Sequence, residues 1–195
     1  MKKLLVIFFL SLCFMLSTKA DSIKDFKIEG MGLADSLLLF SSKEIIEKNK
    51  IFYPGKKYYR VPLFWDENNN FPRSNQYNVI FGVTKYEDKE YVIESLEAFN
   101  DFDNNISGCL SKKKKITDEI IKLFPNSKEP ANSVTNSRYR GGKAKVHLSI
   151  FHLEKGKIQI SCYEHSEDAK KNGKSDVLAV AIYSLEFAKY LASIN

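Results

Sequence analysis

The segment KAKVHLSIFHLEKGKIQISCY, residues 143–163, decides the architecture of this chain. Two runs rich in apolar residues, Lys143 to Leu153 and Lys157 to Tyr163, flank the pair Lys155-Gly156. Such runs around a short break that contains glycine predict a β-hairpin. The hairpin places Cys162 on its returning strand.

The clearest helix precedes this hairpin, from Asn104 to Phe124. Asp103 or Asn104 can cap its start, and Pro125 ends it. Cys109 lies on its apolar face, from which a helix can reach a strand beneath it. The residues on that face lie three or four positions apart, namely Ile106, Cys109, Leu110, Ile116, Ile120, Leu123 and Phe124.

The first 20 residues have the three-part pattern of a secretory signal peptide. Lys2 and Lys3 are followed by an apolar run from Leu4 to Leu16, and Ala20 provides a small residue before the cleavage point. The run of about 13 residues is shorter than the roughly 20 that span a bilayer. An uncleaved anchor and a lipoprotein signal at Cys13 are the alternatives. We therefore expect a periplasmic or secreted protein with no transmembrane segment after cleavage.

Removal of the signal changes both the cysteine count and the charge. Cys109 and Cys162 remain as an even pair, which in an exported protein predicts a disulfide. The bond closes a span of 53 residues (162 minus 109) and contributes roughly 4 kcal/mol in the chain-entropy model. The 30 basic residues fall by three to 27 against 24 acidic ones, so the net charge is about +3. This small excess argues against a nucleic-acid partner.

Residues 21–195 are expected to form one domain. Pro125 to Gly142 is polar and contains several Pro, Asn, Ser and Gly residues, so we predict a flexible surface loop at 125–142. Pro62 indicates an edge position for its strand. The remaining patterns predict strands at 26–29, 58–65, 77–83 and 91–96, and helices at 34–40 and 42–50, the last with a capping box formed by Ser41 and Glu44.

The C-terminal segment from Asp176 to Asn195 allows two interpretations. It could be one long helix, but Leu178, Val180 and Ile182 alternate with a second set of residues. The second set is Val177, Ala179, Ala181 and Tyr183. We favour a strand from Val177 to Tyr183, followed by a helix over Leu185 to Ile194 that Ser184 caps. The order is then helix, three strands, helix, three strands, helix. This order predicts an α+β fold of two α-β-β-β units, with helices on one face of an antiparallel sheet.

Short motifs resemble a family of uncharacterised small exported proteins from marine bacteria with compact genomes. The motifs are Phe26 to Gly30, Ala34 to Leu38, Lys57 to Val61 and Cys109 to Lys115. The resemblance implies an exported α+β protein and no particular activity. The order of elements is also similar to the modules of β-lactamase-inhibitor proteins and of small outer-membrane assembly lipoproteins, a likeness of fold alone.

The candidate catalytic residues gather on or beside the second hairpin. Glu164 lies opposite His147 if Lys155-Gly156 is a two-residue turn, and His165 follows directly. A histidine–carboxylate pair could act as an acid–base dyad or contribute two metal ligands. Ordinary polar positions on the outer face are the simpler interpretation. We therefore predict no metal site and no cofactor.

Two surface features suggest other partners. Lys112, Lys113, Lys114 and Lys115 could bind an anionic lipid or another polyanion, although four consecutive lysines spread around a helix. The aromatic residues Tyr53, Tyr58, Tyr59, Phe64 and Trp65 are expected mostly in the core or on a sheet face, and recruitment of a partner at an edge strand is the alternative. We expect a non-catalytic binding or interaction protein of the periplasm or cell envelope, with an unknown envelope protein or ligand as partner. A small secreted hydrolase and a polyanion or membrane-surface binder are the alternatives.

Overall fold

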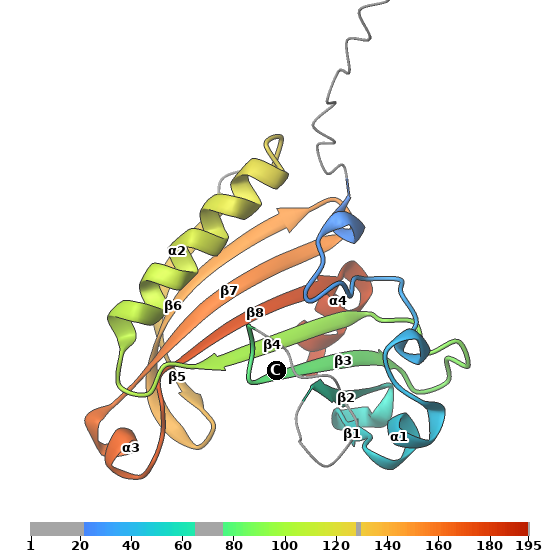
Figure 1. Ribbon diagram of the computed structural model, residues 1–195, viewed down its shortest axis with the longest axis horizontal. Helices are drawn as coiled ribbons and strands as arrows, with labels where there is room; N and C mark the ends of the chain where they lie inside the picture. The colour runs from blue at the N-terminus through green and yellow to red at the C-terminus, as the bar shows by residue number, and fades with distance from the viewer. Residues whose placement is uncertain (1–21, 65–75, 128–129, 195) are drawn as a thin grey trace, which may run out of the picture.

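A single antiparallel sheet organises the chain (Figure 1). The computed structural model describes residues 22–64, 76–127 and 130–194, so the predicted signal peptide lies outside the described residues. Strand order across the sheet is β1-β2-β3-β4-β8-β7-β6-β5. The strands are β1 (Ile51–Phe52), β2 (Tyr58–Phe64), β3 (Val79–Lys85), β4 (Ser95–Asp101), β5 (Ala131–Tyr139), β6 (Gly142–Leu153), β7 (Gly156–His165) and β8 (Val177–Ser184).

The long helix α2 (Ile106–Leu123) covers one face of the sheet (Figure 1). It packs on β7 and β8, and its buried residues are Cys109, Ile116 and Ile120. These join the main core with alternate residues of the strands beneath, such as Ile160 and Val180. Asn105 caps the helix by accepting the Gly108 N–H at 2.9 Å, one residue later than the predicted caps. The predicted helix is thus confirmed with a shifted start.

The C-terminal helix α4 (Leu185–Ile194) lies on the opposite face of the sheet. Ser184 caps it by accepting the Phe187 N–H at 3.1 Å. Phe187 is fully buried against Tyr58, Val83 and Tyr183, in a second core separate from the one beneath α2. The favoured division into strand and closing helix is confirmed. Helices were predicted on one face only, whereas α2 and α4 lie on opposite faces.

The central strand β8 explains why the C-terminal pattern was ambiguous. It lies between β4 and β7, and every residue from Val177 to Tyr183 is buried. A strand covered on both faces is apolar along its whole length and gives little alternation. β8 joins the β2-β3-β4 and β5-β6-β7 groups into one sheet, so the α+β prediction is confirmed.

The predicted loop at 125–142 was wrong over Ala131 to Tyr139, which form the edge strand β5. β5 pairs with β6 in continuous register from Ala131 opposite Ile150 to Tyr139 opposite Gly142. Residues 131–138 are all exposed, so the strand needs no apolar side chains. Its polar composition is therefore that of a surface loop. The strand is held by backbone hydrogen bonds, which require no alternation of apolar and polar residues in the sequence.

Several short elements differ from the predictions. The returning strand expected at 91–96 is β4, which extends to Asp101. The strand expected at 26–29 contributes only an isolated bridge between Ile28 and Met31. Ser42, not Ser41, caps α1. The remaining helical elements are η1 (Ile23–Asp25), η2 (Leu37–Leu39), α1 (Lys43–Lys48), η3 (Pro54–Lys56) and α3 (Glu167–Lys171).

Pro62 lies where β2 has lost its outer neighbour. β1 pairs only with Tyr59 and Arg60, and β3 pairs with the other side of β2. A proline is tolerated there because no strand of the described chain lies on that side to accept a hydrogen bond from a backbone N–H. Within residues 22–64, 76–127 and 130–194, no helix is both long and apolar enough to cross a membrane.

Candidate functional site

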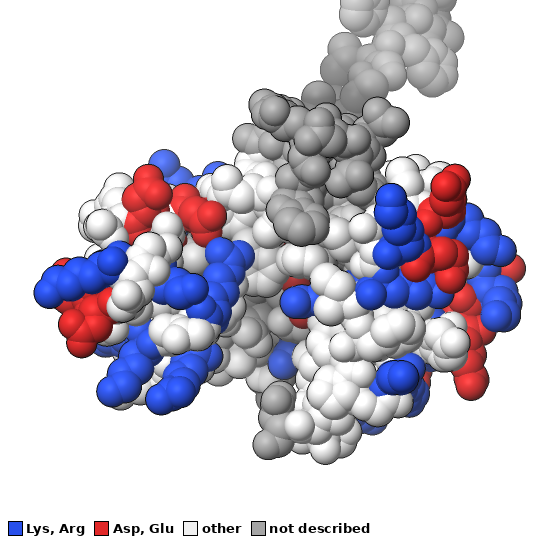
Figure 2. All heavy atoms as spheres, turned by 90° about the horizontal axis from the view of Figure 1, so that it is seen from below, with Lys and Arg blue, Asp and Glu red and all other residues white. Residues whose placement is uncertain are grey.

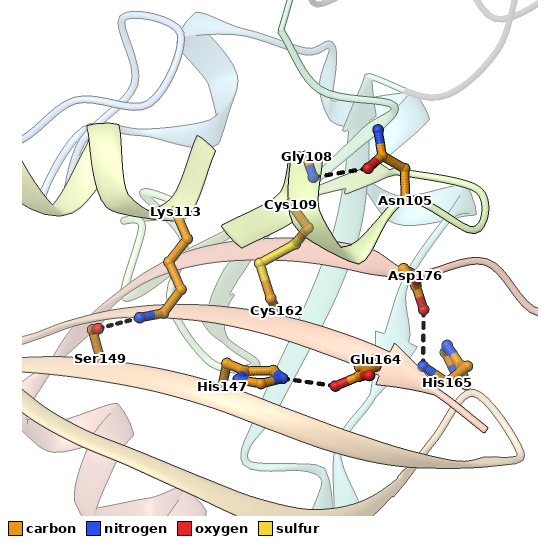
Figure 3. The surroundings of a disulfide bond; sticks show 10 residues. All are labelled: Asn105, Gly108, Cys109, Lys113, His147, Ser149, Cys162, Glu164, His165 and Asp176. Carbon is orange, nitrogen blue, oxygen red and sulfur yellow. Dashed lines mark hydrogen bonds and ion pairs between the residues drawn. A yellow bond between two sulfur atoms is a disulfide. The ribbon is translucent and has the colours of Figure 1, made fainter. Parts of the chain in front are cut away.

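The predicted disulfide joins the long helix to the sheet. Cys109 on α2 and Cys162 on β7 are bonded, with Cα atoms 6.0 Å apart (Figure 3). Both residues are fully buried in the main core. The bond is compatible with an oxidising space outside the cytoplasm. Its role in this position is to hold α2 against the hairpin.

His147 and Glu164 lie beside the disulfide and bond to one another (Figure 3). Their Nε2 and Oε2 atoms are 2.9 Å apart, and the ring nitrogen donates because a carboxylate only accepts. The two residues are diagonal neighbours, since the register sets His147 opposite Cys162 and Glu164 opposite Lys145. The prediction that Glu164 lies directly opposite His147 was wrong, because the two-residue turn is Glu154-Lys155, one position earlier than expected.

The electrostatics of this pair favour the ionised form of Glu164. The hydrogen bond from His147 lowers the pKa of Glu164 below its ordinary range, against a smaller effect of burial. Both side chains are partly exposed, at 18% for His147 and 34% for Glu164. A carboxyl group with a lowered pKa is a weak general acid or base at neutral pH. The pair therefore fits a role in stabilising the hairpin.

His165 lies apart from the pair, and its ring nitrogens form hydrogen bonds with backbone carbonyl groups. It is buried, with Nδ1 at 2.7 Å from the Ser175 carbonyl oxygen and Nε2 at 3.2 Å from that of Tyr139. The backbone N–H of His165 donates to Asp176 Oδ1 at 2.9 Å. Lys170 Nζ lies 3.3 Å from Oδ2 of the same carboxylate. This network ties the end of β5 to the loop before β8. The predicted histidines thus do not converge on one site.

The four lysines of α2 point in different directions. Lys113 donates to the Ser149 hydroxyl on the sheet (Figure 3), and burial lowers the pKa of Lys113. Lys114 pairs with Asp118 at 2.6 Å. Lys112 and Lys115 line a groove beside the N-terminal segment. The run therefore offers no single cationic patch for a polyanion.

The sheet face turned away from α2 carries a group of residues that the sequence predictions missed. These side chains alternate with the core residues of the same strands. On β8, Ala179 and Ala181 occupy this face, whereas the core face has Leu178, Val180 and Ile182. Around these small residues lie Arg60 on β2, Phe81 on β3, Glu97 and Phe99 on β4, Ser161 and Tyr163 on β7, and Tyr183 on β8.

The tip of the β5–β6 hairpin closes one side of this group. Tyr139 stacks on Tyr163 with ring centroids 3.8 Å apart. Arg140 Nη1 lies 3.2 Å from Asp101 Oδ1 at the end of β4, and the guanidinium lies over the Phe99 ring. Tyr53, which packs against Phe187 of α4, lies on the other side. We call Tyr53, Arg60, Phe81, Glu97, Phe99, Tyr139, Ser161, Tyr163, Ala179, Ala181 and Tyr183 together the Glu97 site.

Glu97 is the acidic centre of the Glu97 site. Its side chain is 12% exposed, and burial raises its pKa above the ordinary range, against the opposing effects of Arg60 and Tyr53. Burial raises the pKa of Tyr53, Tyr139, Tyr163 and Tyr183, and the charge of Glu97 adds to each rise. Four neutral phenols therefore lie around one carboxyl group.

The hydrogen bonding of Glu97 is incomplete among the residues that the structure describes. The Tyr53 hydroxyl lies 3.5 Å from Oε1, and Arg60 Nη1 lies 3.9 Å from Oε2. Both distances exceed the 2.7–3.2 Å of an ordinary hydrogen bond. A buried carboxylate usually has closer donors, so this one has capacity to accept more.

Figure 2 shows the underside of the molecule as drawn in Figure 1, the side away from α2. Charged side chains gather toward its two sides. Between them, the described surface carries few charged side chains.

The aromatic stretch, expected mostly in the core or on a sheet face, is divided between the two faces of the sheet. Tyr53 and Tyr58 pack on Phe187, whereas Tyr59 is buried in the main core. The Phe64 side chain and Trp65 lie outside the described residues. A signal for the Glu97 site was present in the sequence, since Phe81, Phe99 and Tyr163 are aromatic at positions where an exposed face would be polar. No protein-family model, curated protein or solved structure matches this chain.

Proposed function

We infer that this chain is an exported, non-catalytic binding protein whose ligand lies in the Glu97 site. The observation that carries the proposal is the Glu97 carboxyl group, which is buried among aromatic rings, and whose nearest donors among the described residues lie at 3.5 and 3.9 Å. Binding sites typically combine apolar and aromatic walls with a few polar groups that fix orientation. The Glu97 site has this composition.

The small floor of the site supports the same proposal. Ala179 and Ala181 lie between larger residues of β4 and β7, in register with Phe99 and Glu97 on one side and Ser161 and Gln159 on the other. Their side chains are short, and a bulkier residue at either position would project into the Glu97 site. A periplasmic or secreted location, with a disulfide and a signal sequence, is part of this proposal.

Native mass spectrometry can test whether the site holds a small molecule. The purified protein is incubated with a low-molecular-weight extract of the cell envelope, and bound masses are recorded. We expect a ligand on the natural protein that is lost in Ala179→Phe, where the new ring occupies the floor. Val134→Phe, on the exposed strand β5, is the matched control and should keep the ligand. Equal binding by Ala179→Phe would contradict the proposal.

A further inference from the structure

The polar atoms of the Glu97 site are spaced for a hydroxyl group. Arg60 Nη1 donates and Glu97 Oε2 accepts, and the two atoms are 3.9 Å apart. This distance is too long for a direct hydrogen bond, but an oxygen atom about 2.8 Å from each of the two atoms can bridge them. A hydroxyl suits this position because it both donates and accepts. The other carboxyl oxygen, Oε1, accepts a long hydrogen bond of 3.5 Å from the Tyr53 hydroxyl.

The charges of the site favour a neutral ligand. Arg60 lies near Glu97, and Arg140 is paired with Asp101. An organic cation would compete with three cationic side chains already placed over the rings, namely Arg60 over Phe81, Arg140 over Phe99 and Tyr139, and Lys157 over Tyr183. An anion would meet the buried carboxyl group of Glu97. The charges of the site therefore favour neither a cationic nor an anionic ligand.

The rings supply an apolar surface beside these polar atoms. Tyr139 and Tyr163 are stacked at an interplanar angle of 16°, and Phe99 lies beside Tyr139 with centroids 6.5 Å apart. Rigid aromatic rings offer a large contact area at low cost in side-chain entropy. A ligand with one C–H face and several hydroxyl groups would use both parts of the site at once.

We propose that the Glu97 site binds a neutral sugar ring, with one hydroxyl bridging Arg60 and Glu97 and the C–H face against Tyr163, on the side of the ring away from Tyr139. The inference rests on the proposed function, since it names the ligand class of the same site. The planar guanidinium of Arg60 and the carboxyl group of Glu97 fix the orientation of the sugar. Tyr163 supplies the contact area, and Tyr139 supports it by stacking on its other face.

Saturation-transfer NMR and titration calorimetry with three sets of probes test the proposal. The neutral set is cellotriose, laminaritriose and chitotriose, the cationic set is spermidine and tyramine, and the anionic probe is trigalacturonic acid. We expect binding within the neutral set. Arg60→Lys keeps the charge but removes the planar fork, and should weaken binding about tenfold. Glu97→Gln should weaken it about 10- to 100-fold, as expected for the loss of a charged hydrogen-bond acceptor.

Two tyrosine variants separate the rings of the site from tyrosines in general. Tyr163→Leu removes the stacked ring and should abolish the transfer signal from the sugar C–H protons. Tyr86→Leu, an exposed tyrosine near the β1–β2 edge of the sheet, should leave that signal unchanged. Sugar binding that is unaffected by both Glu97→Gln and Tyr163→Leu would place the sugar elsewhere and overturn the inference.

The remaining outcomes distinguish this inference from the proposed function. If only the cationic or anionic probes bind, and Ala179→Phe blocks them, the sugar is wrong and the binding function stands. If no probe of any class binds, and envelope extracts also give no bound mass, the proposed function fails together with the inference.

Discussion

Cys109 on the first turns of α2 and Cys162 near the end of β7 are joined with their Cα atoms 6.0 Å apart, which fixes the helix to the centre of the sheet. The bond closes a span of 53 residues. We predict that the double variant Cys109→Ala, Cys162→Ala loses roughly 4 kcal/mol of unfolding free energy, measured by urea denaturation. Reduced natural protein is the control and should lose a similar amount. Free thiols in the exported protein, found by mass spectrometry, would contradict the pairing.

The hydrogen bond between His147 and Glu164 predicts a pH dependence of stability. Because the pKa of Glu164 is lowered in the folded protein, its contribution is present above the unfolded pKa of about 4.3 and is lost as the pH falls through the folded pKa. We expect Glu164→Gln to cost less than about 1 kcal/mol at pH 7, since the pair is partly exposed. The difference from the natural protein should vanish in acid. A constant difference down to pH 2 would show that ionisation is not its cause.

The buried ring of His165 predicts a larger loss. Replacement by Phe removes both ring nitrogens, so at least one of the carbonyl oxygens of Tyr139 and Ser175 loses its donor. We expect a loss of about 2–3 kcal/mol in unfolding free energy, together with faster amide hydrogen exchange at the end of β5. His152→Phe, an exposed histidine of the same hairpin, is the control. Unchanged exchange in β5 would mean that His165 does not hold this strand.

Gly156 begins β7 where a side chain has no room. A Cβ atom there would collide with the Tyr183 carbonyl oxygen on β8 and lie 2.9 Å from Ile23 Cδ1. We predict that Gly156→Ala costs about 1–3 kcal/mol through forced backbone shifts, measured by urea denaturation. Gly173→Ala has open space around its Cβ but a φ of 74°, so it reports the cost of backbone strain alone. A smaller loss for Gly156→Ala than for Gly173→Ala would refute the steric explanation.

The elements with buried side chains were the ones that the sequence could predict. α2 and β6–β7 carry strong periodic patterns because each buries one face. β5 left no such pattern, since residues 131–138 are exposed and only its backbone pairs. The hairpin turn was misplaced by one position because both Lys155-Gly156 and Glu154-Lys155 can connect the same two strands.

The candidate site was harder to predict than the fold. The His147–Glu164 contact was expected and occurs, but through a diagonal register. The Glu97 site gathers residues from six strands, β2, β3, β4, β5, β7 and β8, together with Tyr53 after β1. Such a site depends on strand order, which local periodicity does not encode. Glu97 itself looks like any polar residue on the outer face of a strand.

The central claim is that Glu97 is kept for a ligand and not for the fold. Burial raises its pKa, so the folded state binds the proton more tightly than the unfolded state does. Stability from this group is therefore greatest below the unfolded pKa and falls as the pH rises through the folded pKa. At neutral pH the charged form is the unfavourable one, and a neutral side chain of the same shape relieves it.

The most direct test is the unfolding free energy of Glu97→Gln at pH 7, measured by urea denaturation beside the natural protein and Glu164→Gln. We predict that Glu97→Gln is more stable than the natural protein by about 1 kcal/mol, as is common for residues kept for function at the expense of stability. Glu164→Gln should be less stable. A loss of stability in Glu97→Gln would contradict the claim, because it would make Glu97 a structural residue whose partners hold the sheet together.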